Sequence, residues 1–409
     1  MARAAIISVD GHVKAPRAAY REYLDPSFRD DFDDWVQELD GTPDGFVHAG
    51  IGEVGQWDAA RRIADLETQG IVAEVVYGNG QPLDGGRGGH PTDARVIRAS
   101  NMAYNRWLVD FCSQAPGRIN GQAAVSFDDV DRAVADIHWA ADNGLVGVMM
   151  PALRADGPFF FDPALDPIWA AGQETGLPFG QHGGTGAPDY QPQSFASFMV
   201  LATEHSFFSG RSLWQLILGG VFERFPDLKV VWAETEDWWI RPVMELMDGR
   251  ETRGDDWSEF AETLARLKPY TRLPSEYFRT NCYVGLSPFS SRYPSVGSLG
   301  TAGPDPEGFA VRSTNAMIGA DYPHPETAFP GLLREIKAFV DHPDVSEDDA
   351  RRVLYGNAAE VYRLDLAALR PHIDRVGFDL DAIPVPEGNA GPDLTILADL
   401  AARNEAGVS

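Results

Sequence analysis

The sequence predicts an α/β protein folded as a (β/α)₈ barrel, and two patterns lead to this prediction. Short apolar runs rich in β-branched residues recur along the chain, and segments with helical periodicity separate them. There are eight runs, and their nearly continuous hydrophobicity is typical of parallel strands buried on both faces. The runs are Ala4–Asp10, Ile71–Gly78, Ile119–Phe127, Gly147–Ala152, Leu177–Gly184, Leu228–Glu234, Thr280–Gly285 and Ala316–Asp321.

The segments between the runs have the periodicity of helices that pack one face against a core. Apolar residues recur at spacings of three and four in Asp129–Asn143 and again in Arg211–Phe225. Ser346 and Asp349 have the spacing of a capping box, which predicts a helix over Asp348–Arg363. Each of these helices would cover one side of the predicted barrel.

We predict one domain, because the sequence contains no internal repeat, heptad array or low-complexity tract. Three long connections rich in glycine and proline, at residues 13–57, 78–92 and 183–210, follow predicted strands. In a barrel they would lie on the C-terminal face, where such connections form the walls of active sites. The predicted organisation is a barrel over residues 1–370, with insertions at about 13–57, 183–210 and 249–277, and a C-terminal extension over residues 371–409.

The composition argues against several kinds of partner. The chain has 409 residues with 34 basic and 61 acidic side chains, a net charge of −27, whereas nucleic acids and anionic membranes bind basic patches. No apolar run approaches the roughly 18 residues of a membrane span, and Met1–Arg3 leads into the first run without the features of a signal peptide. The two cysteines, Cys112 and Cys282, are too few for a disulfide framework. A cytoplasmic location is expected, because thiols stay reduced in that compartment.

Acidic and imidazole side chains stand where four of the predicted strands end. The first run ends in SVDGH, the fifth in FGQHGG, the sixth in VVWAE and the eighth in MIGADYPH. Parallel strands of a barrel end on one face, so these side chains would converge there. Asp10 and His12 are two residues apart, so their side chains point to the same side and could hold one ion together. His182 and Asp321 would complete a nitrogen and oxygen set that suits Zn²⁺, Mn²⁺ or Fe²⁺.

Each of these features, taken alone, also has a structural explanation. An Asp-x-His pair is common, a single histidine at a strand end is often only a hydrogen-bonded structural residue, and Gly319–Pro323 could be a strand followed by a turn. Their joint occurrence at separate strand ends favours a metal site. Gly183 and Gly184 would leave room for a ligand to approach the ion.

Five further residues are candidates for the site. Glu234 ends the sixth run and could carry a proton or only support the ligands through hydrogen bonds. His324 follows the eighth run and could contact substrate or stabilise a turn. Arg87 and His90 lie in the glycine-rich connection after the second run and could bind an anionic substrate or simply be solvated. Trp238 could wall the substrate pocket or pack against a helix.

Several stretches resemble, in the same order, the amidohydrolase-related family that includes aminocarboxymuconate-semialdehyde decarboxylase and related aromatic-acid decarboxylases and hydrolases. They are SVDGHVKAP, RRIADLETQGIVAEVVYG, DPIWAAGQETGLPFGQHGG, GGVFERFPDLKVVWAETEDWW, IGADYPHPE and RRVLYGNAAEVYRL, within about residues 4–365. The resemblance implies a distorted TIM barrel with one catalytic divalent metal ion. It places the ligands at Asp10, His12, His182 and Asp321, and gives Asp321 the further role of acid and base beside a metal-activated water.

Two positions depart from the pattern of many family members. Many members carry His-x-His on the first strand, where this chain has Asp10, and the well-studied decarboxylases end the sixth strand in a proton-handling His, where this chain has Glu234. Asp10 and Asp321 already neutralise a divalent ion, so an ionised Glu234 would leave a formal charge of −1 and raise the pKa of a bound water. Glu234 therefore either holds a proton at neutral pH or pairs with a cation.

Together these features predict a metal-dependent hydrolase that uses a metal-activated water, with Asp321 as general base and Glu234 as proton shuttle. The substrate would be a small organic molecule, aromatic or carboxylated, and the ion would be zinc, with manganese and iron as alternatives. A non-oxidative metal-dependent decarboxylase is the first alternative, and a catalytically inactive binding barrel is the second. The Glu at position 234 favours hydrolysis over decarboxylation. The resemblance and the C-terminal extension favour a homodimer.

Overall fold

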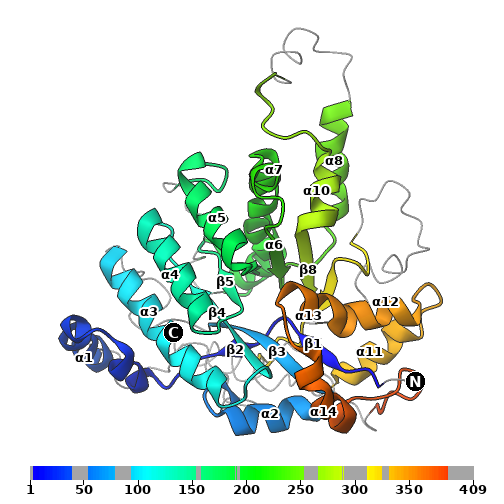
Figure 1. Ribbon diagram of the computed structural model, residues 1–409, viewed down its shortest axis with the longest axis horizontal. Coiled ribbons are helices and arrows are strands. Elements are labelled where there is room, and N and C mark those ends of the chain that lie inside the picture. Colours follow the sequence, from blue (N-terminus) through cyan, green and yellow to red (C-terminus); the bar gives the residue numbers. More distant parts are fainter. Residues whose placement is uncertain are drawn as a thin grey trace.

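The computed structural model describes residues 3–38, 54–78, 94–152, 158–188, 190, 194–252, 266–287, 289, 311–324 and 331–385. Within them the chain forms a nearly closed barrel of eight parallel strands with helices between them (Figure 1). The strands are β1 (Ile6–Ser8), β3 (Ile71–Gly78), β4 (Ile119–Ala124), β5 (Gly147–Met149), β6 (Phe179–His182), β7 (Val230–Ala233), β8 (Cys282–Leu286) and β9 (Ala316–Ile318). The short β2 (His12–Val13) continues the first strand and pairs with β3. The predicted (β/α)₈ barrel is confirmed.

The strands are hydrogen-bonded in the order β1-β3-β4-β5-β6-β7-β8-β9, so each β/α unit places its strand next to the preceding one. The first and last strands approach each other through backbone hydrogen bonds at their C-terminal ends. The amide of Val9 donates to the carbonyl of Ile318 (2.9 Å), that of Asp321 to Asp10 (2.9 Å) and that of His12 to Tyr322 (2.7 Å). The segments that carry the candidate ligands Asp10, His12 and Asp321 are therefore joined by main-chain bonds.

Helices cover the outside of the barrel (Figure 1). An ion pair between Arg98 and Asp136 joins α3 to α4, and α10 lies beside α8. The α-helices are α1 (Arg29–Glu38), α2 (Ala59–Glu67), α3 (Ala94–Ser113), α4 (Val130–Asp142), α5 (Asp166–Thr175), α6 (Phe195–Leu218), α7 (Val221–Arg224), α8 (Ile240–Thr252), α10 (Pro274–Asn281), α11 (Leu332–Val340), α12 (Glu347–Arg351), α13 (Asn357–Val361) and α14 (Leu366–Val376). Short 3-10 turns are η1 (Arg17–Tyr23), η2 (Pro26–Phe28), η3 (Val54–Gln56) and η4 (Pro163–Leu165).

The end of the described chain returns to the N-terminal side of the barrel. Helix α14 runs across residues 370 and 371, so a boundary between barrel and extension at that point would divide a helix. Ala4 and Phe378 then exchange two backbone hydrogen bonds of 2.8 Å just before β1. No helix in the described ranges is both long enough and apolar enough to cross a membrane.

The periodicity predicted some elements accurately and missed others. Strand Ile71–Gly78 has the predicted bounds, and the capping box of Ser346 and Asp349 is present. The helix predicted over Arg211–Phe225 is present as two helices and not one, because the chain turns at Gly220, whose φ is 67°, between the end of α6 and the start of α7. The connection predicted at 183–210 is wrong from Phe195 onward, where α6 begins behind a capping box of its own.

The helix predicted over Asp348–Arg363 is present but is not regular. Its first turns are α12, its middle is a π-helical stretch, η6 (Arg352–Gly356), and its last turns are α13, which ends at Val361. The apolar pattern predicted a buried face, but it carries no signal for a local change of helical pitch. Such π-helical stretches depend on packing against neighbouring elements.

Candidate metal centre

The candidate ligands stand where strands of the barrel end. Asp10 lies between β1 and β2, His12 begins β2, and His182 is the last residue of β6. Glu234 directly follows β7, and Asp321 lies three residues after β9. Parallel strands deliver these side chains to the C-terminal face of the barrel, which is where active sites of this architecture form.

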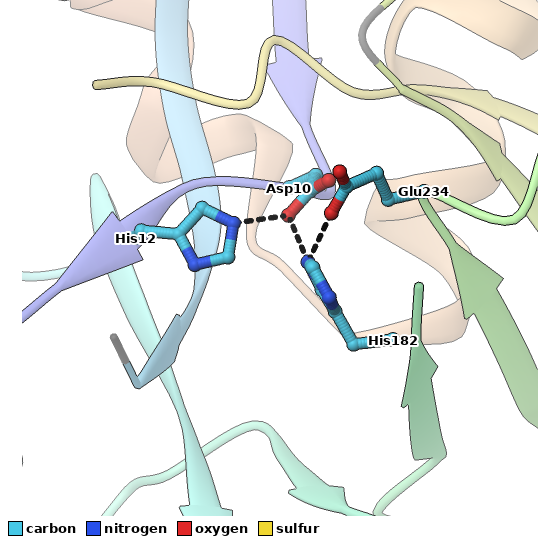
Figure 2. Close-up of side chains that lie close together, drawn as sticks. All are labelled: Asp10, His12, His182 and Glu234. Atoms are coloured by element: carbon cyan, nitrogen blue, oxygen red, sulfur yellow. Dashed lines mark hydrogen bonds and ion pairs between the residues drawn. The ribbon is translucent and has the colours of Figure 1, made fainter. Parts of the chain in front are cut away.

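Four of these side chains form one cluster (Figure 2). Each of Asp10, His12, His182 and Glu234 offers one atom that could bind a metal ion, and these atoms all lie within 4.8 Å of one another. The Nε2 atom of His182 is 3.3 Å from Oδ1 of Asp10 and 3.2 Å from Oε2 of Glu234. The Nε2 atom of His12 is 3.5 Å from the same Asp10 oxygen. The Asp10 carboxylate therefore lies between the two imidazoles.

Asp321 belongs to a second, overlapping cluster with His12 and His324. Its Oδ1 atom lies 3.1 Å from Nε2 of His12 and 2.9 Å from Nδ1 of His324. The rings of His12 and His324 are stacked with their centroids 4.0 Å apart. Because His12 belongs to both clusters, the groups form one continuous site.

The residues present fit a divalent cation. Asp10 and Asp321 are fully buried, and one oxygen of each carboxylate (Oδ2) and the Nδ1 atom of His12 have no hydrogen-bond partner within the described residues. Buried carboxylates that lack hydrogen bonds are costly unless a positive charge compensates them. Carboxylate oxygens and imidazole nitrogens are ligands of Zn²⁺ and Mn²⁺, so a divalent metal ion would satisfy these atoms.

Without a metal ion, the electrostatics of the site separate its two histidines. Burial and the nearby His324 lower the pKa of His12 to about 4, although Asp321 and Asp10 oppose this shift. Burial would also lower the pKa of His182, but the carboxylates of Asp10 and Glu234 outweigh it and raise this pKa to about 10. At neutral pH the metal-free site therefore holds a proton on His182 and none on His12.

The two carboxylates that follow β7 and β9 differ in the same way. Burial and repulsion from Asp321 and Asp10 raise the pKa of Glu234 to about 8, against the effect of His182. Burial would raise the pKa of Asp321 as well, but His324 and His12 hold it well below its usual range. One carboxylate of the metal-free site therefore favours a proton at neutral pH and the other does not.

The backbone at these strand ends is specialised. Glu234 and Asp321 both have left-handed conformations, with φ of 52° and 55°, which non-glycine residues adopt infrequently and which recur at functional sites. Gly183 makes room for the first of them, because a Cβ atom on Gly183 would lie 2.1 Å from the Glu234 carbonyl oxygen. The sequence suggested that Gly183 leaves room for a ligand, whereas in the structure the space is occupied by the backbone of Glu234.

A cavity of about 330 Å³ opens beside His12 and His182. Met149 and Met150 contribute apolar wall, and Asn101, Ser126 and Thr185 contribute polar groups. Within the described residues, no lysine, arginine, aspartate or glutamate lines this cavity. Its volume is at the lower end of the roughly 300–1,000 Å³ of small-molecule sites.

The remaining candidates lie in different positions. His324 contacts Asp321, as described above, whereas Trp238 is 51% exposed and does not line the cavity. Arg87 and His90 lie outside the described residues, so their predicted contact with substrate stays a prediction.

Sequence reasoning missed Tyr77. It pairs with His12 across the β2–β3 ladder, lines the cavity and places its ring edge-on to His182 with centroids 4.8 Å apart. Its position near the C-terminal end of a predicted strand was the available signal, because strand ends converge on the same face.

Comparison with known proteins agrees with this architecture. The chain matches the model of the amidohydrolase family over residues 9–364. Among curated protein sequences, none matches the chain. An amidohydrolase structure from Mycobacterium avium subsp. paratuberculosis is similar, with 18% identity and a TM-score of 0.62, over 88% of this chain and 99% of that chain.

Two decarboxylase structures are also similar. The 5-carboxyvanillate decarboxylase of Sphingomonas paucimobilis has 19% identity and a TM-score of 0.63, over 88% of this chain and 99% of that chain. A dihydroxybenzoic acid decarboxylase from Polaromonas, with bound manganese and the inhibitor 2-nitroresorcinol, has 14% identity and a TM-score of 0.57, over 89% and 98% of the two chains. At these identities the likeness shows a shared fold. The family model covers most of the chain, residues 9–364, including all of the strand ends that carry the candidate ligands. The chain therefore belongs to the amidohydrolase family.

Proposed function

We propose that this protein is a metal-dependent hydrolase of a small organic substrate. The observation that carries the proposal is the pair of carboxylates Glu234 and Asp321, which reach the same group of ligands from two different strand ends. The surroundings raise the pKa of Glu234 and lower that of Asp321. A hydrolase needs one group that takes a proton from water and another that gives a proton to the leaving group. Two titratable groups whose surroundings separate their pKa values fit such an acid and base pair.

The metal ligands we propose are Asp10, His12, His182 and Asp321. When bound there, a divalent ion would act as a Lewis acid and lower the pKa of water in the site. Zinc suits this nitrogen and oxygen set, and manganese is the alternative that the manganese-containing decarboxylase structure favours. Metal analysis of the purified protein by mass spectrometry, with and without reconstitution, decides between them, and a protein that binds neither ion would contradict the proposed site.

The protein groups would divide the proton transfers between them. Asp321 would accept a proton from water, since His12 and His324 keep its carboxylate ionised. Glu234, whose side chain is 21% exposed, would donate a proton to the leaving group. Nε2 of His182 is 3.2 Å from Oε2 of Glu234, so Glu234 lies directly beside this proposed ligand. A negatively charged substrate would be met by the metal ion, because the described part of the cavity lining carries no lysine or arginine.

A non-oxidative decarboxylase is the second candidate, and the similar decarboxylase structures favour it. In that reaction Asp321 would deliver a proton to the carbon that loses carbon dioxide, and no water would be consumed. The same ligands and the same cavity would serve both reactions. The two candidates therefore differ in the role of Glu234 and in the fate of water.

Turnover in ¹⁸O-labelled water distinguishes these reactions. Aromatic amides, esters and hydroxybenzoates would be incubated with the reconstituted protein, and the products analysed by mass spectrometry. We expect one ¹⁸O atom in a product of hydrolysis. Release of carbon dioxide without incorporation of label during catalysis would show that the protein is a decarboxylase and that Glu234 orients the substrate.

We further propose that the protein acts as a homodimer in the cytoplasm. Helix α6 presents exposed apolar side chains, with Phe195 78% and Phe207 54% exposed, and a second copy of the chain would cover them. Light scattering coupled to size-exclusion chromatography tests the dimer. Phe207→Glu should shift the protein toward monomer, whereas Leu267→Glu, at a residue 72% exposed elsewhere, should not. A monomeric wild type would contradict the proposal.

A further inference from the structure

A fully buried ion pair lies next to the site without reaching the cavity. Arg62 of α2 and Glu74 of β3 both have no solvent exposure, and neither lines the cavity. The Arg62 guanidinium donates through Nε to Oε1 of Glu74 and through Nη2 to Oε2 at 2.9 Å. This is the bidentate geometry in which the planar guanidinium matches a carboxylate.

The remaining donors of Arg62 bind backbone carbonyl groups. Its Nη1 atom donates to the carbonyls of His12 (2.8 Å) and Gly55 (3.1 Å), and Nη2 donates to that of Tyr322 (3.4 Å). The five N–H donors of the guanidinium thus have five acceptor atoms. Two of these acceptors belong to His12 and to the residue after Asp321. Arg62 therefore binds both of the strand ends that carry these two proposed ligands.

The chain around the pair is shaped to admit it. A Cβ atom on Gly11, between Asp10 and His12, would lie 2.6 Å from Oε2 of Glu74 and 2.7 Å from Nη2 of Arg62. Any larger residue at this position would push the ion pair away from the backbone between the two ligands.

Helix α2 also holds the strand end at Tyr322 by a second route. The guanidinium of Arg62 lies over the Tyr322 ring, 4.9 Å from its centroid. The Tyr322 hydroxyl donates to Oδ2 of Asp65, one turn further along the same helix, at 2.7 Å. Residues of α2 thus contact both the backbone carbonyl and the side chain of Tyr322.

We infer that the Arg62–Glu74 pair positions the metal ligands, by fixing the backbone of His12 relative to that of Asp321 where the barrel closes. The inference rests on the proposed function, in that it takes these two residues to be ligands. Glu74 orients the guanidinium and neutralises its charge, and Arg62 distributes the remaining N–H groups between the two strand ends. Arg62 is thus a positioning residue that acts through His12 and Asp321. A buried ion pair contributes little net stability compared with apolar packing, so orientation is its principal contribution.

Arg118 provides a matched control. It is also a buried arginine, 6% exposed, that binds a glutamate and a backbone carbonyl: Nη1 donates to Glu67 (2.6 Å) and Nε to Val72 O (2.8 Å). Its partners lie toward the N-terminal end of β3, away from the strand ends that carry the ligands. A lysine at either position keeps the charge and loses the planar fork.

The test compares the Mn²⁺ affinity of Arg62→Lys with that of Arg118→Lys. Calorimetry measures the affinity, and electron paramagnetic resonance reports the coordination of the bound ion. We expect Arg62→Lys to bind Mn²⁺ about 10–100-fold more weakly than wild type, the effect usual for residues that orient metal ligands. Arg118→Lys should stay within about threefold of wild type, because the Arg118 side chain donates to Glu67 and Val72, neither of which contacts a proposed ligand. Equal affinity in Arg62→Lys and wild type, or an equal loss in both variants, would overturn the inference.

A second pair of measurements keeps the test decisive when stability changes. The variant Arg62→Met/Glu74→Leu replaces the pair with apolar side chains and should unfold at a similar denaturant concentration to wild type, yet bind Mn²⁺ as weakly as Arg62→Lys. If Arg62→Lys does not fold, this double variant provides the comparison, and wild-type affinity in it would refute the positioning role.

Hydrogen exchange separates failure of this inference from failure of the proposed function. The amides of His12 and Asp321 donate to carbonyls across the closure of the barrel, and in Arg62→Lys they should exchange about tenfold faster or more, at unchanged rates elsewhere. In Arg118→Lys their rates should equal those of wild type. If wild-type protein binds no metal, the proposed function fails, while these exchange rates still decide whether Arg62 positions the two strand ends.

Discussion

Glu234 after β7 and Asp321 after β9 are carboxylates in the same backbone conformation, yet their surroundings differ. Asp321 is fully buried and contacts two imidazoles, those of His12 and His324. Glu234 is 21% exposed and contacts one imidazole, that of His182, which it shares with Asp10. The number of imidazoles and the proximity of other carboxylates thus explain why the pKa of Asp321 is lowered and that of Glu234 is raised. The left-handed backbone brings each carboxylate to the site, and the neighbours decide which of them holds a proton.

The largest expected effect follows from removing the base at the end of β9. Asp321→Asn keeps the size of the side chain but cannot accept a proton, so kcat should fall by about 10²–10⁴-fold or more. Circular dichroism should match wild type, because the amide fits the same space. Activity within about tenfold of wild type, with metal still bound, would assign the base to another residue.

The second prediction compares the imidazole on each side of the site. His182→Ala removes a proposed ligand and should abolish most of the stoichiometric metal, whereas His324→Ala should retain it, because His324 is proposed only to keep Asp321 ionised. Metal content after dialysis against a weak chelator measures the difference. The reverse order of the two variants would place the ion in the cluster of His12, Asp321 and His324.

The third prediction concerns the acid at the end of β7. Glu234→Gln preserves shape but cannot donate a proton, so kcat should fall by about 10²-fold while the metal content stays near that of wild type. Glu236→Gln, two residues further along the chain and also in a left-handed conformation, is the control and should leave kcat unchanged. Loss of metal in Glu234→Gln would show instead that Glu234 is a ligand.

The smallest expected effect, about tenfold for each pH unit, is the pH dependence of metal binding to the metal-free protein. The pKa of His182 is raised to about 10, so between pH 6 and 9 a metal ion must displace its proton. Affinity should therefore rise about tenfold for each pH unit. Calorimetry in buffers of different ionisation enthalpy should count one proton released per ion at pH 7, because Glu234 keeps its own. Release of two protons would mean that Glu234 ionises and binds the metal.

The sequence by itself determined the barrel and the face of the barrel that carries the candidate ligands. Eight short apolar runs separated by helical segments indicate parallel strands, because strands buried on both faces are apolar along nearly their whole length. Asp10, His12, His182 and Asp321 could be selected because the ends of parallel strands meet on one face, whatever the details of packing. Strand Ile71–Gly78 could be bounded correctly, since a glycine at each end separates it from polar segments.

Only the tertiary structure decided the helix at Phe195, the proton affinities and the ion pair behind the ligands. The glycines and prolines of residues 183–210 led to the prediction of a long connection, whereas the folded chain forms α6 from Phe195 onward. Arg62 and Glu74 are 12 residues apart and meet only after α2 folds back on β3, so their spacing in the sequence carries no signal. Glu234 and Asp321 are likewise equivalent as strand-end carboxylates in the sequence. They differ in the folded chain because a pKa depends on burial and on distances to other charges, and these distances exist only once the barrel has closed.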